Sequence, residues 1–122
     1  FDAVIDFDRY TDEDKVEVAT IILNELLKQF KNVARDLKLF KKIIYSSNTI
    51  PNPGDLRNMI RTSLAFSDPQ DPHDYQKRLL RSLHSGKNLS IFKLSELGFT
   101  VREIEILTGV SKSSVSRELS EG

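Results

Sequence analysis

The chain of 122 residues contains no cysteine, no tryptophan and a single methionine. The absence of cysteine excludes disulfides, thiolate metal sites and thiol nucleophiles, and agrees with a reducing compartment such as the cytoplasm. No apolar run approaches the roughly 18 residues of a membrane-spanning helix, and no secretory leader is recognisable. We therefore expect a soluble, cytoplasmic protein. The chain begins with Phe1, as a processed product or a piece of a longer protein would.

Charge of either sign is not in excess, since 18 basic and 18 acidic residues give a formal net charge of zero. The charges are nevertheless segregated along the chain. The first 17 residues are acidic, through Asp2, Asp6, Asp8, Asp12, Glu13, Asp14 and Glu17. Residues 76–95 contain no acid but five cations, Lys77, Arg78, Arg81, Lys87 and Lys93. Such a basic stretch can attract an anionic partner although the chain is neutral overall.

Patterns typical of catalytic or metal sites are also lacking. His73 and His84 have no acidic or thiolate partners at metal-ligand spacing. Asp68, Asp71 and Asp74 lack the glycine and glutamate of a calcium loop, and are more typical of turns and helix caps. There is no glycine-rich phosphate loop. We expect no enzymatic activity, no metal and no cofactor.

An apolar heptad pattern dominates the first half of the chain. Apolar residues recur every seven positions in two interleaved series, Val16, Leu23, Phe30, Leu37, Ile44 and Ala19, Leu26, Val33, Phe40. No glycine or proline interrupts the pattern, Thr11 can cap its start, and Pro51 and Pro53 follow its end. The pattern predicts one long helix over residues 12–45, roughly 50 Å in length.

A rod of this length needs a partner, either a second copy of the chain or downstream helices that fold back. Ile22, Leu27, Ala34 and Ile43 widen the apolar stripe, which favours a helical bundle whose long helix also forms part of a homodimer interface. The expected interface residues are Leu23, Leu26, Phe30, Val33, Leu37 and Phe40. The opposite face is basic, through Lys28, Lys31, Arg35, Lys38 and Lys42.

Further short helices are predicted downstream, with apolar faces around Leu56, Leu79 and Leu94 and breaks at Pro69, Pro72 and Gly86. No segment alternates convincingly as a strand, apart from the very short stretch 3–7. The sequence thus predicts an all-α fold. Residues 1–54 form an acidic segment plus the dimerising helix, and residues 55–122 form a second helical domain.

The stretch 100–119, TVREIEILTGVSKSSVSREL, predicts two capped helices joined by a glycine turn. Thr100 and Glu103 have capping-box spacing, and Gly109 suits a turn conformation that is costly for residues with a Cβ. Ser111 can cap the second helix, in which Val115 and Leu119 face the first. The outer face of that helix carries Lys112, Ser113, Ser116, Arg117 and Ser120.

The segment EILTGVSKSSVSREL resembles the helix-turn-helix of bacterial and phage DNA-binding proteins, including resolvase-like, transposase-like and IclR-like regulators. The likeness covers only about residues 100–119. In that motif the second helix enters the major groove and the first crosses the sugar-phosphate backbone. The resemblance implies DNA contacts by Arg102, Ser111, Lys112, Ser113, Ser116, Arg117 and Ser120. Glu105 departs from the motif, which usually has a small residue there.

Within this resemblance, Arg117 is the candidate for reading a guanine edge, and Lys112 and Arg102 are candidates for phosphates. Lys77, Arg78, Arg81, Lys87 and Lys93 are further candidate phosphate contacts. The basic face of the long helix is either a solvated surface or a face that lies along DNA. The structural alternative for residues 100–120 is a plain helical hairpin closing a small core.

The leading hypothesis is a sequence-specific, double-stranded DNA-binding transcriptional regulator. It would act as a homodimer, because a symmetric pair doubles the site that one recognition helix reads. In a bacterium it would associate with the nucleoid. One alternative is the DNA-targeting part of a recombinase, a transposase or a plasmid replication or partition protein. Another is a helical protein-interaction module, with RNA polymerase or another regulator as partner.

Overall fold

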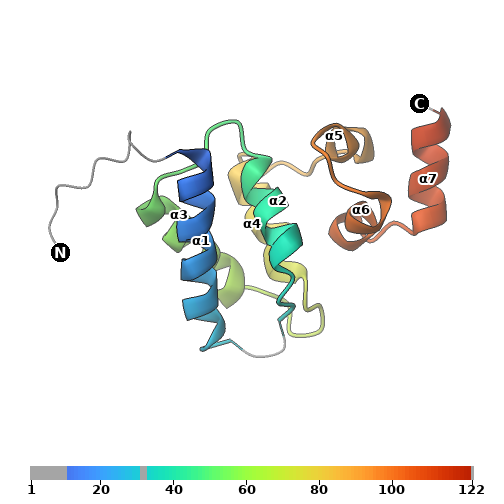
Figure 1. The fold of residues 1–122 in the computed structure, drawn as a ribbon. Helices are drawn as coiled ribbons and strands as arrows, with labels where there is room; N and C mark the ends of the chain where they lie inside the picture. Colours follow the sequence, from blue (N-terminus) through green and yellow to red (C-terminus); the bar gives the residue numbers. More distant parts are fainter. Residues whose placement is uncertain (1–10, 31–32, 122) are drawn as a thin grey trace, which may run out of the picture.

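A computed structural model describes residues 11–30 and 33–121, and within them every regular element is an α-helix (Figure 1). The predicted all-α fold is confirmed for this part of the chain. The acidic residues expected before Thr11, the stretch 3–7 and Lys31 lie outside the described residues. The seven helices are α1 (Asp12–Leu27), α2 (Leu37–Tyr45), α3 (Pro53–Ala65), α4 (Asp74–Leu83), α5 (Ile91–Glu96), α6 (Val101–Thr108) and α7 (Lys112–Glu121).

The helices form two groups that lie side by side. Helices α1 to α4 pack on one another as a four-helix body, and α5 to α7 pack on one another as a three-helix unit (Figure 1). The two groups meet where α4 contacts α6. A boundary at residue 54 would therefore run through the four-helix body, because α3 and α4 pack directly on α1 and α2.

The prediction of one continuous helix over residues 12–45 is wrong, because α1 ends at Leu27 and α2 begins at Leu37. After the intervening segment the chain reverses, so α2 runs antiparallel to α1 (Figure 1). Tertiary hydrogen bonds hold the end of that segment: the Ala34 N–H donates to the Pro72 carbonyl (2.8 Å) and the Tyr75 hydroxyl donates to the Ala34 carbonyl. The Asp36 carboxylate then caps α2 by accepting from the Leu39 N–H (3.1 Å).

The heptad residues build the core of the chain itself. Leu23 and Phe40 are fully buried, and Leu26 is 4% exposed. Phe30, Val33 and Leu37 are half-buried and pack against the same core. The residues expected at a homodimer interface are therefore committed to intramolecular packing, which corrects that expectation. A wide apolar stripe is compatible with two short antiparallel helices as well as with one long helix.

No helix in the described part of the chain combines the length and the apolarity that a membrane crossing requires.

The basic face of α2 differs from the expected solvated stripe at one position. Lys42 is half-buried and faces α6, whereas Lys38, one turn earlier, is exposed. This face of α2 therefore contributes, with the contact of α4 and α6, to the junction between the four-helix body and the three-helix unit.

Candidate nucleic-acid interface

Helix α6 starts with the capping box that the sequence predicts. The Thr100 hydroxyl accepts from the Glu103 N–H (3.2 Å), and the Glu103 carboxylate accepts from the Thr100 N–H (2.8 Å). Ile104 and Leu107 face the core from this helix. The helix ends at Thr108 and is followed by the C-cap residue Gly109, whose φ of 78° lies in the left-handed region. The turn that orients α7 therefore depends on a residue without a Cβ.

Replacing Gly109 by alanine should lower the free energy of unfolding by about 1–2 kcal/mol, the usual cost of a left-handed residue with a Cβ. A Cβ built at Gly109 meets no atom within 4 Å, so the whole cost arises from the backbone. Chemical denaturation measures the loss. Gly54→Ala is the matched control, because Gly54 lies in α3 without a positive φ and should be neutral or stabilising. Equal stability of G109A and wild type would contradict the turn geometry.

Helix α7 is anchored from beneath and capped from two sides. Val115 is fully buried and Leu119 is half-buried against the core. The Ser111 hydroxyl accepts from the Ser114 N–H (3.3 Å), and the Glu105 carboxylate accepts from the Lys112 N–H (3.1 Å). Glu105, the departure from the motif, thus satisfies a free N–H group at the start of α7. It ties the two helices of the hairpin together where a small residue would allow a closer crossing.

The residues predicted to contact DNA lie at the surface. Helix α7 packs on α5 and α6 and lies at the end of the molecule opposite α1 (Figure 1). Its outer face is not covered by the described part of the four-helix body. The side chains that are exposed are Arg102, Ser111, Lys112, Ser113, Ser116, Arg117 and Ser120. Helix α7 therefore presents Lys112, Arg117 and several hydroxyl groups to solvent, together with the exposed carboxylates of Glu118 and Glu121.

The likeness to a helix-turn-helix rests on the two caps, the left-handed turn and the polar outer face of α7. No protein-family model, curated protein or solved structure matches this chain. The chemistry of α7 and its surroundings must therefore carry any functional conclusion. Any role of the cations of the four-helix body must likewise be argued from their chemistry.

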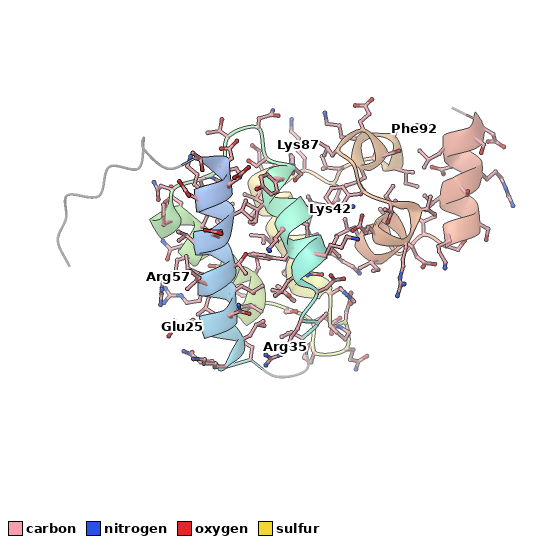
Figure 2. The ribbon with its side chains drawn as sticks, viewed as in Figure 1. Glu25, Arg35, Lys42, Arg57, Lys87 and Phe92 are labelled. Atoms are coloured by element: carbon pink, nitrogen blue, oxygen red, sulfur yellow. The ribbon has the colours of Figure 1, made fainter. Side chains whose placement is uncertain are left out.

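A contact that the sequence did not predict joins α2 to the start of α6. The Lys42 ammonium lies 2.7 Å from the Glu103 carboxylate and donates to the Gly98 carbonyl at 3.3 Å. Figure 2 labels Lys42 on the side of α2 that faces α6. Burial raises the pKa of Glu103, but the hydrogen bonds from Lys42 and Thr100 outweigh it and hold the pKa below its usual value. Glu103 therefore caps α6 and also fixes it to the body.

Replacing Glu103 by glutamine should weaken this joint in a pH-dependent way. Because the folded-state pKa is lowered, the ionised carboxylate stabilises the fold above its ordinary pKa of 4.5, and this stabilisation is lost as pH falls through the lower folded-state value. We expect E103Q to be less stable than wild type at pH 7, by up to about 1 kcal/mol for a pair near the surface.

Urea titrations of both proteins between pH 7 and pH 2 measure this difference. Glutamine keeps a neutral cap at Thr100, so the comparison isolates the charge. The two stabilities should converge at the acidic end. A gap that stays constant over the whole pH range would contradict the assigned role of the carboxylate.

Two of the candidate phosphate contacts are engaged within the chain. The Lys77 ammonium lies 2.6 Å from the Asp71 carboxylate, and the Arg78 Nε lies 2.6 Å from the Asp74 carboxylate. The acids that neutralise them precede residue 76, just outside the stretch that looked purely basic. Of the other three cations, Lys87 and Lys93 are exposed and Arg81 is half-buried. The basic surface of α4 is therefore weaker than its sequence indicates.

A serine and a histidine meet at the end of α2, a pairing that resembles a nucleophile and its base. The Ser46 hydroxyl lies 2.9 Å from Nε2 of His84, but it donates its only proton to the Ile43 carbonyl (2.6 Å). Nε2 must then donate to Ser46 and cannot accept its proton. Burial, with a smaller effect of Lys93, lowers the pKa of His84. This pair of side chains is bonded at the C-terminal end of α2 and is not arranged for nucleophilic attack.

No cluster of metal-ligating side chains occurs among residues 11–30 and 33–121.

Proposed function

We propose that this chain is a sequence-specific double-stranded DNA-binding protein that reads the major groove with the outer face of α7, as part of a transcriptional regulator. The observation that carries the proposal is the joint exposure of Lys112 and Arg117 on a helix whose buried face is fixed by Val115. A recognition helix needs this combination of a rigid base and a free polar face.

The side chains of α7 suit distinct roles at a DNA surface. Arg117 lies one turn into the helix and carries a guanidinium that can donate to both acceptors on a guanine edge. Lys112 is the first residue of α7, and its ammonium group can bind a phosphate at the edge of the groove. Ser113 and Ser116 flank them with short hydroxyl groups that can reach a base or a phosphate.

The composition of the outer face favours DNA over a protein partner. Protein interfaces are centred on aromatic or aliphatic anchors. The large apolar side chains exposed on the described residues are Ile21, Tyr45, Phe66 and Phe92, and none of them lies on α7. The exposed side chains of α7 are hydroxyl groups, the cations Lys112 and Arg117, and the carboxylates of Glu118 and Glu121, so this surface suits a polar partner better than an apolar pocket.

Two copies on symmetric half-sites would double the sequence that is read. Such a pairing would use a surface other than the heptad residues, because Leu23, Leu26 and Phe40 are buried and Phe30, Val33 and Leu37 pack against the core of the chain. An inverted repeat in the selected DNA would support the paired arrangement. A single asymmetric site would indicate that one copy acts alone.

Selection of bound duplexes from a random library tests the proposal, followed by fluorescence anisotropy on the selected duplex and on a scrambled one. We expect a preferred sequence and an affinity that falls as salt rises. Lys112→Gln should weaken binding to both duplexes by a similar factor. Arg57→Gln removes the same charge from α3, on the side of the molecule away from α7 (Figure 2), and should change little. Recovery of no enriched sequence would refute sequence-specific recognition.

A further inference from the structure

A hollow of about 370 Å³ lies between α2 and the start of α6, beside the helix that would cross the DNA backbone. One wall is formed by Asp36 and Lys38. The other is formed by Thr100, Arg102, Glu103 and Ile106, and His73 also lines the hollow. Lys38 and Arg102, which are 64 positions apart in sequence, therefore line one surface depression.

The two carboxylates at this hollow are already engaged. Asp36 accepts from the Leu39 N–H (3.1 Å) as the cap of α2. Glu103 is paired with Lys42 at 2.7 Å. Lys38 and Arg102 are exposed, and within residues 11–30 and 33–121 neither forms an ion pair. These two cations are the side chains at the hollow that are free to bind an anion.

The orientation of α2 follows from the joint at Lys42. Lys38 lies four residues before Lys42, and residues spaced by four lie on the same face of a helix. Since Lys42 contacts Glu103 and Gly98, Lys38 also faces the start of α6, one turn farther along. A strand that passes along Arg102 on α6 therefore comes within reach of Lys38 on α2.

We propose that Lys38 and Arg102 together bind the sugar-phosphate backbone at one edge of the groove that α7 enters, so that the four-helix body is part of the DNA interface. This inference rests on the proposed function. The ligand is the phosphate backbone of duplex DNA, and the contact carries no base preference. The joint between Lys42 and Glu103 then has a clear role, because it holds the two halves of the phosphate site in register.

Fluorescence anisotropy with the selected duplex, between 0.05 and about 0.3 M salt, tests this inference on wild type, K38Q, R102Q, the double variant and the control R57Q. Each phosphate contact makes the fall of log affinity with log salt concentration steeper by about 0.9. This corresponds to about a fivefold contribution to the affinity at about 0.15 M salt. K38Q and R102Q should each lose about that much on specific and scrambled duplexes alike. The double variant should lose about 25-fold, and R57Q should match wild type.

The outcomes separate this inference from the proposed function. Binding that falls in K112Q but stays at the wild-type level in K38Q would overturn the inference and leave recognition by α7 intact. Equal small losses of affinity in K38Q and R57Q would also overturn the inference, because such losses would report only the change in overall charge. A wild-type chain that binds no duplex would overturn both. Lys38 is exposed, so an unchanged unfolding midpoint of K38Q verifies that the fold is preserved.

Discussion

Replacing Phe40 by alanine is expected to lower the free energy of unfolding by about 3–5 kcal/mol, the usual cost of truncating a buried phenylalanine. Phe40 is fully buried between the helices of the four-helix body. The loss combines the transfer of the ring to water with the cavity that remains. It is a large share of the 5–15 kcal/mol that typically stabilises a domain.

Urea denaturation at two protein concentrations, tenfold apart, measures this effect and decides what the heptad residues do. If they form the core of one chain, as the structure has them, the transition midpoint is independent of concentration in wild type and variant alike. Ile21→Ala is the matched control, because Ile21 lies in α1 with 64% of its surface exposed and should lose little. If F40A is unfolded, Phe40→Leu gives a smaller loss in the same direction. A midpoint that rises with concentration, and a loss in F40A that disappears at low concentration, would assign Phe40 to an interface between copies.

Replacing Arg117 by alanine is expected to weaken binding to the selected duplex by about 1–3 kcal/mol, which is roughly 5- to 150-fold. The expected loss is larger than for a phosphate contact because a bidentate contact to guanine reads a base as well as a charge. Binding to a scrambled duplex should fall much less. The preference for the selected sequence should therefore shrink, and competition with base-substituted duplexes would show which position is relaxed.

Lys112→Gln serves as the matched comparison for Arg117, since both residues are exposed cations of α7. It should weaken binding to specific and scrambled duplexes by similar factors. Equal behaviour of the two variants would mean that Arg117 contacts phosphate and does not read a base. Unchanged binding by both would remove α7 from the interface.

The local features of the C-terminal hairpin could be predicted from the sequence because their causes are local. The capping box of Thr100 and Glu103 depends on residues three apart, and the left-handed turn at Gly109 depends on one missing Cβ. The burial of Val115 follows from its spacing in α7. In each case the groups that interact are neighbours in the chain, so their identities and spacing are sufficient.

The break between α1 and α2 could not be predicted, because both arrangements need the same apolar pattern. The segment before α2 is held by hydrogen bonds of Ala34 with Pro72 and Tyr75, about forty residues away. The contact of Lys42 with Glu103 spans 61 positions. The hydrogen bond from the Lys112 N–H to the Glu105 carboxylate could not be predicted either. The sequence shows that Glu105 replaces the small residue of the motif, but it does not show which group this side chain contacts. These features depend on which helices meet, and no local pattern contains that information.

We propose that the outer face of α7 is the surface that binds duplex DNA. Titration of the isotopically labelled chain with the selected duplex, followed residue by residue through backbone amide resonances, tests it most directly. We expect the largest changes in the resonances of residues 111–120 and around Arg102, and little change in the amides of α1 and α3. Changes confined to α1 and α3, with residues 111–120 unaffected at saturation, would contradict it.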